Sequence, residues 1–365
     1  MSLDPVQRLR GAVARLERQH QSAQAAAQTA FEAAHRHAPS RSAATPPLES
    51  AAIHVFWRTH TGQRDWPVEW VHGALLARCL SGLEVDDWPA LAPLCGRPVL
   101  FLANHQVAIE TLLFALAVPA VLGRPVLSLA KREHRDSWLG RLGAHCAAYP
   151  GVRLPPMLAF FDRADPASLL AMADDLGQTI GREGLSLMVH AEGTRARACR
   201  QPVARLSSAI LDLAVAWALP VVPVRFTGGL PVTPAPATLD FPLGFARQRI
   251  HLGRPLLSEA LAPLPTGARR QAVLEALNRT GLPWEHEVAG VADPRFGAAV
   301  RALAERHRLQ PQKAAVVQAL AAHPPAIGLY RHLIAGLEGC AAPPCASAAE
   351  GAWFDGLLDW ARRHD

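Results

Sequence analysis

A histidine and a glutamate, five positions apart in the segment NHQVAIE, are the residues of this sequence best suited to acid–base chemistry. An imidazole becomes an effective general base when a carboxylate orients it and stabilises its protonated form. Residues five apart do not share a helix face, but the side chains can meet if His105 occupies a strand-to-helix turn and Glu110 lies early in the helix. We predict a general-base pair. The alternative is a capping histidine beside a glutamate that complements the helix dipole.

Basic side chains form a second candidate group. Lys131, Arg163 and Arg195 each stand at the end of a predicted strand or just past it. Three converging cations would bind a phosphate or a carboxylate, and arginine can do so through two parallel hydrogen bonds. Ion pairs with neighbouring aspartates and glutamates are the alternative for each of these residues.

The segment HAEGTR adds Glu192, Gly193 and Thr194 to Arg195. Its glycine indicates a point where the backbone passes close to another group. A carboxylate and a guanidinium lie on either side of it in the sequence. The sequence has no G-x-S-x-G elbow, no H-E-x-x-H motif, no Walker loop and no G-x-G-x-x-G fingerprint. These absences argue against a serine hydrolase, a zinc hydrolase and the common nucleotide-binding sites.

Five short apolar segments predict the buried strands that must position these residues. In chain order they are RPVLFLANH, RPVLSLAK, PPMLAFFDR, LSLMVHAEGTR and PVVPVRFTGG. Helices are predicted over about 107–121, 165–184 and 203–219, and one more strand near 249–252. This alternation predicts an α/β fold with a largely parallel central sheet flanked by helices.

Ligands of a parallel sheet bind beyond the carboxyl ends of its strands. The candidate residues that fall near a predicted strand end are His105, Lys131, Arg163, Glu192 and Arg195. Scattered surface charge would not follow strand ends so regularly. This coincidence is the strongest physical indication of a binding site in the sequence.

We divide the chain into three regions. Residues 1–50 are predicted to form an amphipathic helix, at about 3–38, and a linker rich in Pro, Ser and Ala. Residues 51–257 would form the α/β domain, with a mostly helical start at 51–96. Residues 258–365 would form a helical extension. The first helix could pack on itself, dimerise, dock on a partner or lie on a membrane surface.

Composition limits the partners and the location. The 365 residues include 37 Lys and Arg against 31 Asp and Glu, a net charge of +6 that suits an acidic ligand, an acidic carrier protein or an anionic membrane surface. No nucleic-acid reading motif appears. The six cysteines are scattered and predict reduced thiols. No signal-peptide core or membrane-spanning run is found, so we expect a cytoplasmic protein without a transmembrane helix, with peripheral attachment to the inner membrane face as an option.

Four blocks, taken together and in this order, resemble the glycerolipid acyltransferase superfamily, typified by 1-acyl-glycerol-3-phosphate (lysophosphatidate) acyltransferases. NHQVAIE stands for the family's N-H-x-x-x-x-D block, FFDR for a block ending in an aromatic residue and Arg, HAEGTR for F-P-E-G-T-R-S, and VVPVRF for V-P-V. The resemblance covers about 96–255. The residues of these blocks are also similar to those of acyltransferase domains attached to polyunsaturated-fatty-acid or polyketide-type synthases.

The resemblance implies an O-acyltransferase of the α/β class that needs neither a cofactor nor a metal. His105 would remove the proton of an acceptor hydroxyl, and Glu110 would orient His105. The residues that would bind a glycerol-phosphate-type acceptor are Lys131, Arg163, Glu192, Gly193, Thr194 and Arg195. The arginines would hold its phosphate, while Lys131 is included on its position alone. Acyl carrier protein or acyl-CoA would supply the acyl group, and a glycerophospholipid-type molecule would receive it.

Three departures from the family pattern leave the acceptor open. Glu110 replaces the family's Asp, as in the more distant late acyltransferases of lipid A synthesis, which use acyl carrier protein. Ala191 replaces the usual Pro and follows His190, an added titratable group, and Arg225 stands where a small or apolar residue is usual. The alternatives are acyl transfer to a non-phosphorylated hydroxyl and a non-catalytic acyl-binding or docking module of a lipid-synthase complex.

Overall fold

A computed structural model describes residues 50–62, 67–155, 157–162 and 166–364 of the chain. The predicted N-terminal helix, its linker and Arg163 lie outside the described residues. Among the described helices, none combines the length and the apolar character needed to cross a bilayer.

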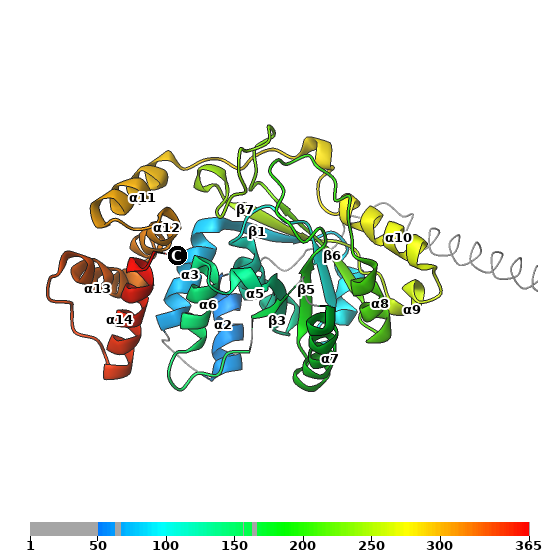
Figure 1. Cartoon of the computed structure of the whole chain (residues 1–365), viewed down its shortest axis with the longest axis horizontal. Helices are drawn as coiled ribbons and strands as arrows, with labels where there is room; N and C mark the ends of the chain where they lie inside the picture. The colour runs from blue at the N-terminus through cyan, green and yellow to red at the C-terminus, as the bar shows by residue number, and fades with distance from the viewer. Residues whose placement is uncertain (1–49, 63–66, 156, 163–165, 365) are drawn as a thin grey trace, which may run out of the picture.

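A seven-stranded sheet forms the centre of the molecule (Figure 1). In the order β1-β7-β6-β2-β5-β3-β4, its strands are Leu80–Val85, Gln248–Leu252, Val221–Thr227, Leu100–Ala103, Ser186–His190, Val126–Lys131 and Leu158–Phe161. The strands β2 to β6 pair in parallel, whereas β7 runs antiparallel to β6 and parallel to β1. The predicted α/β fold with a largely parallel sheet is confirmed.

Helices cover both faces of this sheet. Before residue 258 they are α2 Ser50–Thr61, α3 Pro67–Cys79, α4 Trp88–Leu91, α5 Glu110–Leu122, α6 Trp138–Ala147, α7 Pro166–Glu183 and α8 Ser208–Ala216. In the extension they are α9 Ser258–Leu261, α10 Thr266–Arg279, α11 Pro294–His307, α12 Pro311–Ala321, α13 Ile327–Glu338 and α14 Ala348–Arg362. The predicted helical character of the extension is confirmed.

Side chains of β2 show why the sheet needs two helical layers. Leu100 and Leu102 are buried in one cluster with α7, α8 and α10, while Phe101 and Ala103 are buried in another with α5. Because alternate residues of a strand point to opposite faces, a strand that is apolar throughout must be covered on both. The helix α5 is apolar on all sides and packs in turn against α2 and α3.

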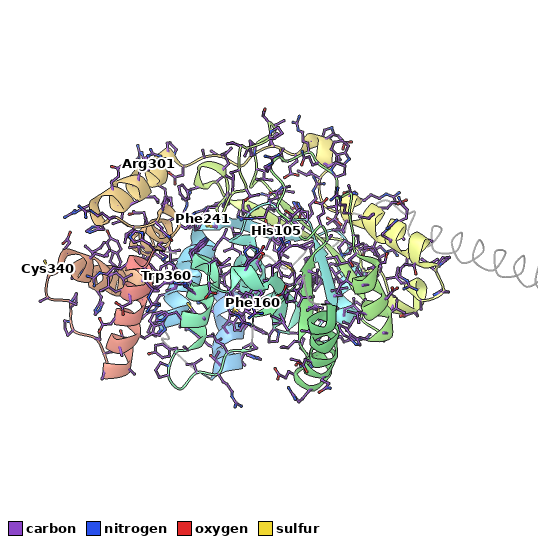
Figure 2. All side chains as sticks on the ribbon, viewed as in Figure 1. His105, Phe160, Phe241, Arg301, Cys340 and Trp360 are labelled. Carbon is purple, nitrogen blue, oxygen red and sulfur yellow. The ribbon has the colours of Figure 1, made fainter. Side chains whose placement is uncertain are left out.

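The C-terminal extension does not pack as one unit. The helix α10 lies on the sheet beside α8, whereas α11 to α14 gather around α3 and α6 at the far side of the molecule (Figure 1). Figure 2 shows His105 near the middle of the molecule, with Arg301 and Cys340 out on this second group of helices. The predicted boundary at residue 257 stays a prediction, because helices on both sides of it share the sheet.

Two details differ from the sequence predictions. The segment 51–96 is mostly helical as predicted, but it also contains β1, which pairs in parallel with β7, a strand much later in the chain. The helix predicted at 203–219 begins at Ser208, because Val203 instead exchanges both of its backbone hydrogen bonds with the side-chain amide of Asn278. Both differences come from partners distant in sequence, which a local pattern does not contain.

Candidate active site

The turn between β2 and α5 carries the predicted general base. Asn104 fixes this turn to β6, since its amide donates to the carbonyl of Phe226 over 3.0 Å and its side-chain oxygen accepts the Phe226 N–H over 2.7 Å. The carbonyl of His105 accepts the N–H of Ala196 over 2.8 Å. His105 is thus held between the end of the central strand and the loop that follows β5.

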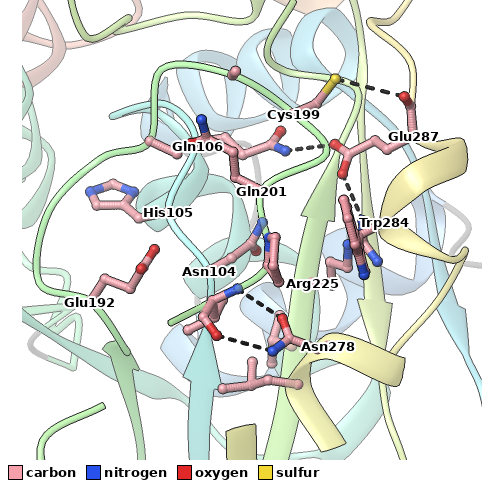
Figure 3. Close-up of a pocket in the computed structure, with 16 residues that line it drawn as sticks. Asn104, His105, Gln106, Glu192, Cys199, Gln201, Arg225, Asn278, Trp284 and Glu287 are labelled. Carbon is pink, nitrogen blue, oxygen red and sulfur yellow. Dashed lines mark hydrogen bonds and ion pairs between the residues drawn. The ribbon is translucent and has the colours of Figure 1, made fainter. Parts of the chain in front are cut away.

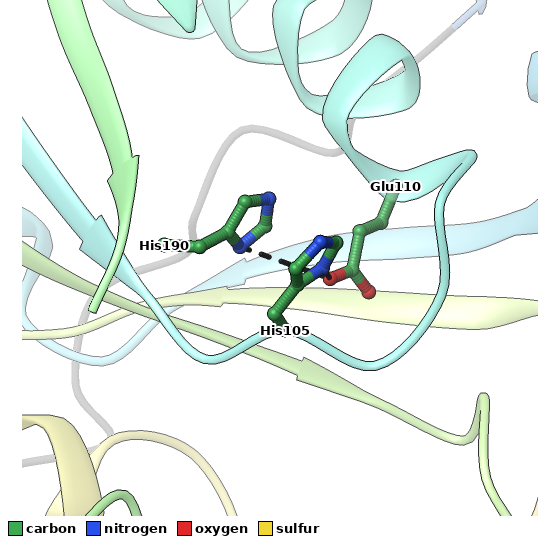
Figure 4. A group of neighbouring side chains, drawn as sticks. All are labelled: His105, Glu110 and His190. Atoms are coloured by element: carbon green, nitrogen blue, oxygen red, sulfur yellow. Dashed lines mark hydrogen bonds and ion pairs between the residues drawn. The ribbon is translucent and has the colours of Figure 1, made fainter. Parts of the chain in front are cut away.

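The structure brings His105 and Glu110 into contact, with 2.6 Å between Nδ1 and Oε1 (Figure 4). Glu110 is fully buried at the first position of α5, where the helix dipole favours a negative charge. Its oxygens also accept the backbone N–H groups of Gln106, over 2.8 Å, and Val107, over 3.2 Å. With Nδ1–H donating to the carboxylate, Nε2 of His105 is left as the atom that can accept a proton.

Burial dominates the ionisation of this pair. It lowers the pKa of His105 to about 3, assisted by the positive charges of Arg195, His134 and Lys131. It raises the pKa of Glu110 to about 7, against the opposing effects of His190 and of the hydrogen bonds to the carboxylate. The imidazole is therefore neutral at neutral pH, and the first proton that the pair takes up binds near pH 7.

His190, at the end of β5, stacks on His105 with ring centroids 3.6 Å apart and an interplanar angle of 13°. Its Nδ1 donates to the carbonyl of Asn104 over 2.8 Å, and its Nε2 accepts from the hydroxyl of Thr111 over 3.0 Å. Burial lowers the pKa of His190 to about 3. His190 is thus a neutral ring that supports the plane of His105.

Donor atoms of His105, Glu110 and His190 lie within 4.8 Å of one another, close enough to consider a metal ion. Both ring nitrogens of His190 are engaged with protein groups, however, and Nδ1 of His105 is bonded to Glu110. Ligation would require these hydrogen bonds to break. We therefore assign the three side chains to a hydrogen-bonded network.

The loop after β5 carries the predicted acceptor-binding residues. Gly193 has a positive φ of 62°, a conformation that suits glycine, and turns the loop back past the end of β5. Glu192 lies beside His105 on the rim of a pocket (Figure 3), and Thr194 is exposed. Arg195 is already engaged, because its Nη1 donates to Asp240 over 2.6 Å and to the carbonyl of Leu239 over 2.7 Å.

The predicted cluster of basic residues is only partly assembled in the described chain. Lys131 and Arg195 lie near enough to His105 to lower its pKa by their charge. Lys131 also pairs with Glu133 at 3.5 Å. Lys131 and Arg195 are thus both ion-paired, which was the alternative interpretation, with Glu133 and Asp240 as partners.

Residues beyond 230 complete the site in a way that the sequence motifs did not predict. The pocket beside His105 is also lined by Leu277, Asn278, Trp284 and Glu287 of the extension (Figure 3). Glu287 forms a 2.8 Å ion pair with Arg225. An arginine inside a buried apolar strand was the one sequence signal for such a partner, because a buried charge requires an opposite one.

A comparison with known proteins agrees with this geometry. Residues 84–227 match the model of the acyltransferase family, from the end of β1 to the end of β6. The matched segment contains the turn of His105 and Glu110 and the loop of Glu192 and Arg195. No curated protein matches the chain. Residues 84–227 thus form a domain of the glycerolipid acyltransferase family.

Proposed function

We propose that this protein transfers a fatty acyl group from a thioester donor to a hydroxyl of a glycerol-phosphate-type acceptor, with His105 as the general base. Membership of an acyltransferase family supports acyl transfer in general. The observation that carries the proposal is the 2.6 Å contact between Nδ1 of His105 and the buried carboxylate of Glu110. This contact favours the tautomer in which Nε2 accepts a proton.

The reaction then needs no covalent acyl-enzyme, because a thioester is already activated. The acceptor oxygen attacks the thioester carbonyl while its proton passes to Nε2 of His105. The carbon–sulfur bond breaks, and His105 returns the proton to the departing thiolate. General-base catalysis of this kind contributes on the order of 10²- to 10⁴-fold.

The donor we propose is acyl carrier protein or acyl-CoA, and the acceptor is a lysophospholipid or glycerol phosphate. Lys131 and Arg195 support an anionic acceptor, because both lie close enough to His105 for their charge to reach it. No cofactor enters the proposed reaction. Association with a membrane surface or with a lipid-synthase complex is part of the same proposal and would bring the protein to its substrates.

A non-phosphorylated acceptor is a second candidate, favoured by one specific observation. Arg195 is neutralised by Asp240, and the described residues that line the pocket beside His105 include Glu192 and Glu287 against one cation, Arg225. Such a pocket would accept an uncharged polyol more readily than a phosphate.

The test uses the purified full chain with acyl-CoA and acyl carrier protein bearing the same acyl group. Each donor is offered glycerol 3-phosphate, lysophosphatidate, glycerol and a monoacylglycerol, and products are identified by mass spectrometry. We expect acylated product with a phosphorylated acceptor and none with His105→Ala. Product only with glycerol or monoacylglycerol would replace the first acceptor class by the second. Transfer to none of them would favour the docking module over an enzyme.

A further inference from the structure

A chain of buried hydrogen bonds connects the partner of His105 with a residue far along the sequence. Glu287 Oε1 accepts from Nε2 of Gln106 over 2.6 Å. The other end of that amide, Gln106 Oε1, accepts from Nε2 of Gln248 over 3.2 Å. The same nitrogen of Gln248 donates to Glu110 Oε2, also over 3.2 Å. All four side chains are buried, with exposed fractions between 0 and 4 %.

The direction of these hydrogen bonds is set by the carboxylates at both ends, Glu287 and Glu110. A carboxylate can only accept hydrogen bonds, so Glu287 requires Gln106 to present its NH₂ group. Gln106 then turns its oxygen inward, where it accepts the N–H of Gly229 over 3.0 Å as well as Nε2 of Gln248. Gln248 presents its NH₂ group to both Gln106 and Glu110. We propose that Glu287 is a positioning residue for the general-base pair: together with the N–H of Gly229 it fixes the direction of the Gln106 amide, and so helps to keep the Gln248 donor on Glu110.

The orientation of the Gln248 amide agrees with this direction. Its Oε1 is buried and has no hydrogen-bond partner among the described residues. An unsatisfied buried oxygen is costly, so the two hydrogen bonds donated by Nε2 must outweigh that cost. The reverse orientation, however, would point Oε1 at the oxygens of Gln106 and Glu110. The observed orientation is therefore the one that the two neighbouring acceptors require.

Glu287 is itself held rigidly. Its Oε2 accepts from Nη2 of Arg225 over 2.8 Å, and its Oε1 also accepts the N–H of Gly228 over 3.3 Å. Glu287 and Gln248 both lie outside residues 84–227, the segment that matches the acyltransferase family. The segment after the family domain thus takes part in the active site. This role rests on the proposed function, because a positioning residue presupposes that His105 acts as a base.

The hydrogen bond that Gln248 donates matters because it favours the ionised form of Glu110. The titratable groups that face this carboxylate are His105 and His190, while Arg195, His134 and Lys131 act on His105. Losing a donor from a buried carboxylate destabilises its charged form. A protonated Glu110 would no longer stabilise the imidazolium of His105, so the effect falls on the chemical step rather than on acceptor binding.

Two variants test the proposal in the full chain. Gln248→Met removes the donor while keeping the side-chain volume, and we expect kcat to fall by about tenfold with KM within twofold. Glu287→Gln combined with Arg225→Met removes the fixed acceptor without leaving a buried charge unpaired. This double variant should lower kcat in the same direction by about threefold to tenfold. In both, the acid limb of the pH–rate profile should move up by about one pH unit.

Arg269→Met is the matched control. Arg269 is also a buried arginine in an ion pair, with Asp212 at 2.6 Å, but it lies on the face of the sheet covered by α8 and α10. Its loss should reduce thermal stability without changing kcat or the acid limb. This variant separates general destabilisation from an effect on Glu110.

A measurement that needs no turnover keeps the positioning role separate from the proposed function. Nitrogen-15 NMR follows the titration of His105. In addition, the NMR resonance of the proton between Nδ1 and Glu110 should change its chemical shift in Gln248→Met and in the double variant, but not in Arg269→Met. Absence of acyl transfer in the native protein would defeat the proposed function alone. If the folded variants keep both the native titration and the native kcat within twofold, the positioning role of Glu287 is wrong.

Discussion

Among the histidine–carboxylate pairs of the described residues, two in different regions differ sharply in burial. His105 contacts Glu110 at 2.6 Å in the turn after β2, and His332 of α13 contacts Asp355 of α14 at 3.1 Å. The side chain of Glu110 is completely buried, whereas 71 % of the Asp355 side chain is exposed. Contact between an imidazole and a carboxylate is thus common to both regions, and burial of the carboxylate is not.

The surroundings of the two carboxylates explain why the first of these pairs, unlike the second, is suited to catalysis. Glu110 lies at the N-terminus of α5 and receives two backbone N–H groups and an amide N–H besides His105. Its orientation is fixed, so it holds His105 in one tautomer. Asp355 is exposed to water, which screens its charge and leaves its position less constrained. A general base of this kind therefore requires a carboxylate that cannot move away.

The largest expected effect concerns the two histidines themselves. His105→Ala should reduce acyl transfer by about 10²- to 10⁴-fold, because no other described group stands in its place to accept the hydroxyl proton. The matched variant His332→Ala should keep the initial rate within twofold. Equal losses in the two variants, measured as thioester consumption, would remove the distinction between the pairs.

The second-largest effect is expected from substitutions of the two carboxylates. Glu110→Gln can present an NH₂ group to Nδ1 of His105 and favour the wrong tautomer, so we expect kcat to fall on the order of 10²-fold. Asp355→Asn, the corresponding change at the exposed pair, should leave kcat unchanged. Circular dichroism and thermal melting would check that both variants fold. A native rate in Glu110→Gln would show that His105 needs no ionised partner.

The pH dependence should distinguish the two pairs further. Burial raises the pKa of Glu110 to about 7, so kcat/KM should be constant above pH 7 and fall about tenfold per pH unit below it. The sign follows from the chemistry: protonation removes the charge that stabilises the imidazolium. His332→Ala should give the same profile, and Glu110→Gln should lose this acid limb. A native profile that is flat from about pH 5 to 8 would contradict the assignment.

The smallest effect is expected at Arg195. Because this guanidinium is already paired with Asp240, Arg195→Ala should raise the KM for a phosphorylated acceptor by only about threefold to tenfold. The KM for a non-phosphorylated acceptor should stay within twofold. If the variant instead turns over at least about a hundredfold more slowly at saturating acceptor, Arg195 lies next to the reacting atoms.

Much of the fold and part of the site could be predicted from sequence, for a local reason. Each of the five parallel strands is a short apolar run, and the fold class follows from their alternation with helices. His105 and Glu110 are five residues apart, so a single strand-to-helix turn suffices to bring them together. Gly193 and Glu192 were identified because they follow a strand end directly.

Other parts of the site depend on residues that are far apart in the chain. His190 stacks on His105 across two neighbouring strands, and Asp240 reaches Arg195 from a separate loop. Arg225 was singled out only as a departure from the family pattern, and nothing in the local sequence identified Glu287 as its partner. The edge strand β1 was not predicted within the mostly helical segment 51–96 for the same reason, since its pairing with β7 is not a local property.

The sequence by itself determined the periodicity of the elements and the turn that joins His105 to its carboxylate, because both arise from neighbouring residues. Only the tertiary structure decided how Glu110 is buried, which residues hold its donors in place and which cations are already neutralised. Burial and hydrogen-bond direction depend on side chains brought together from distant segments, and these set the ionisation on which the chemistry depends.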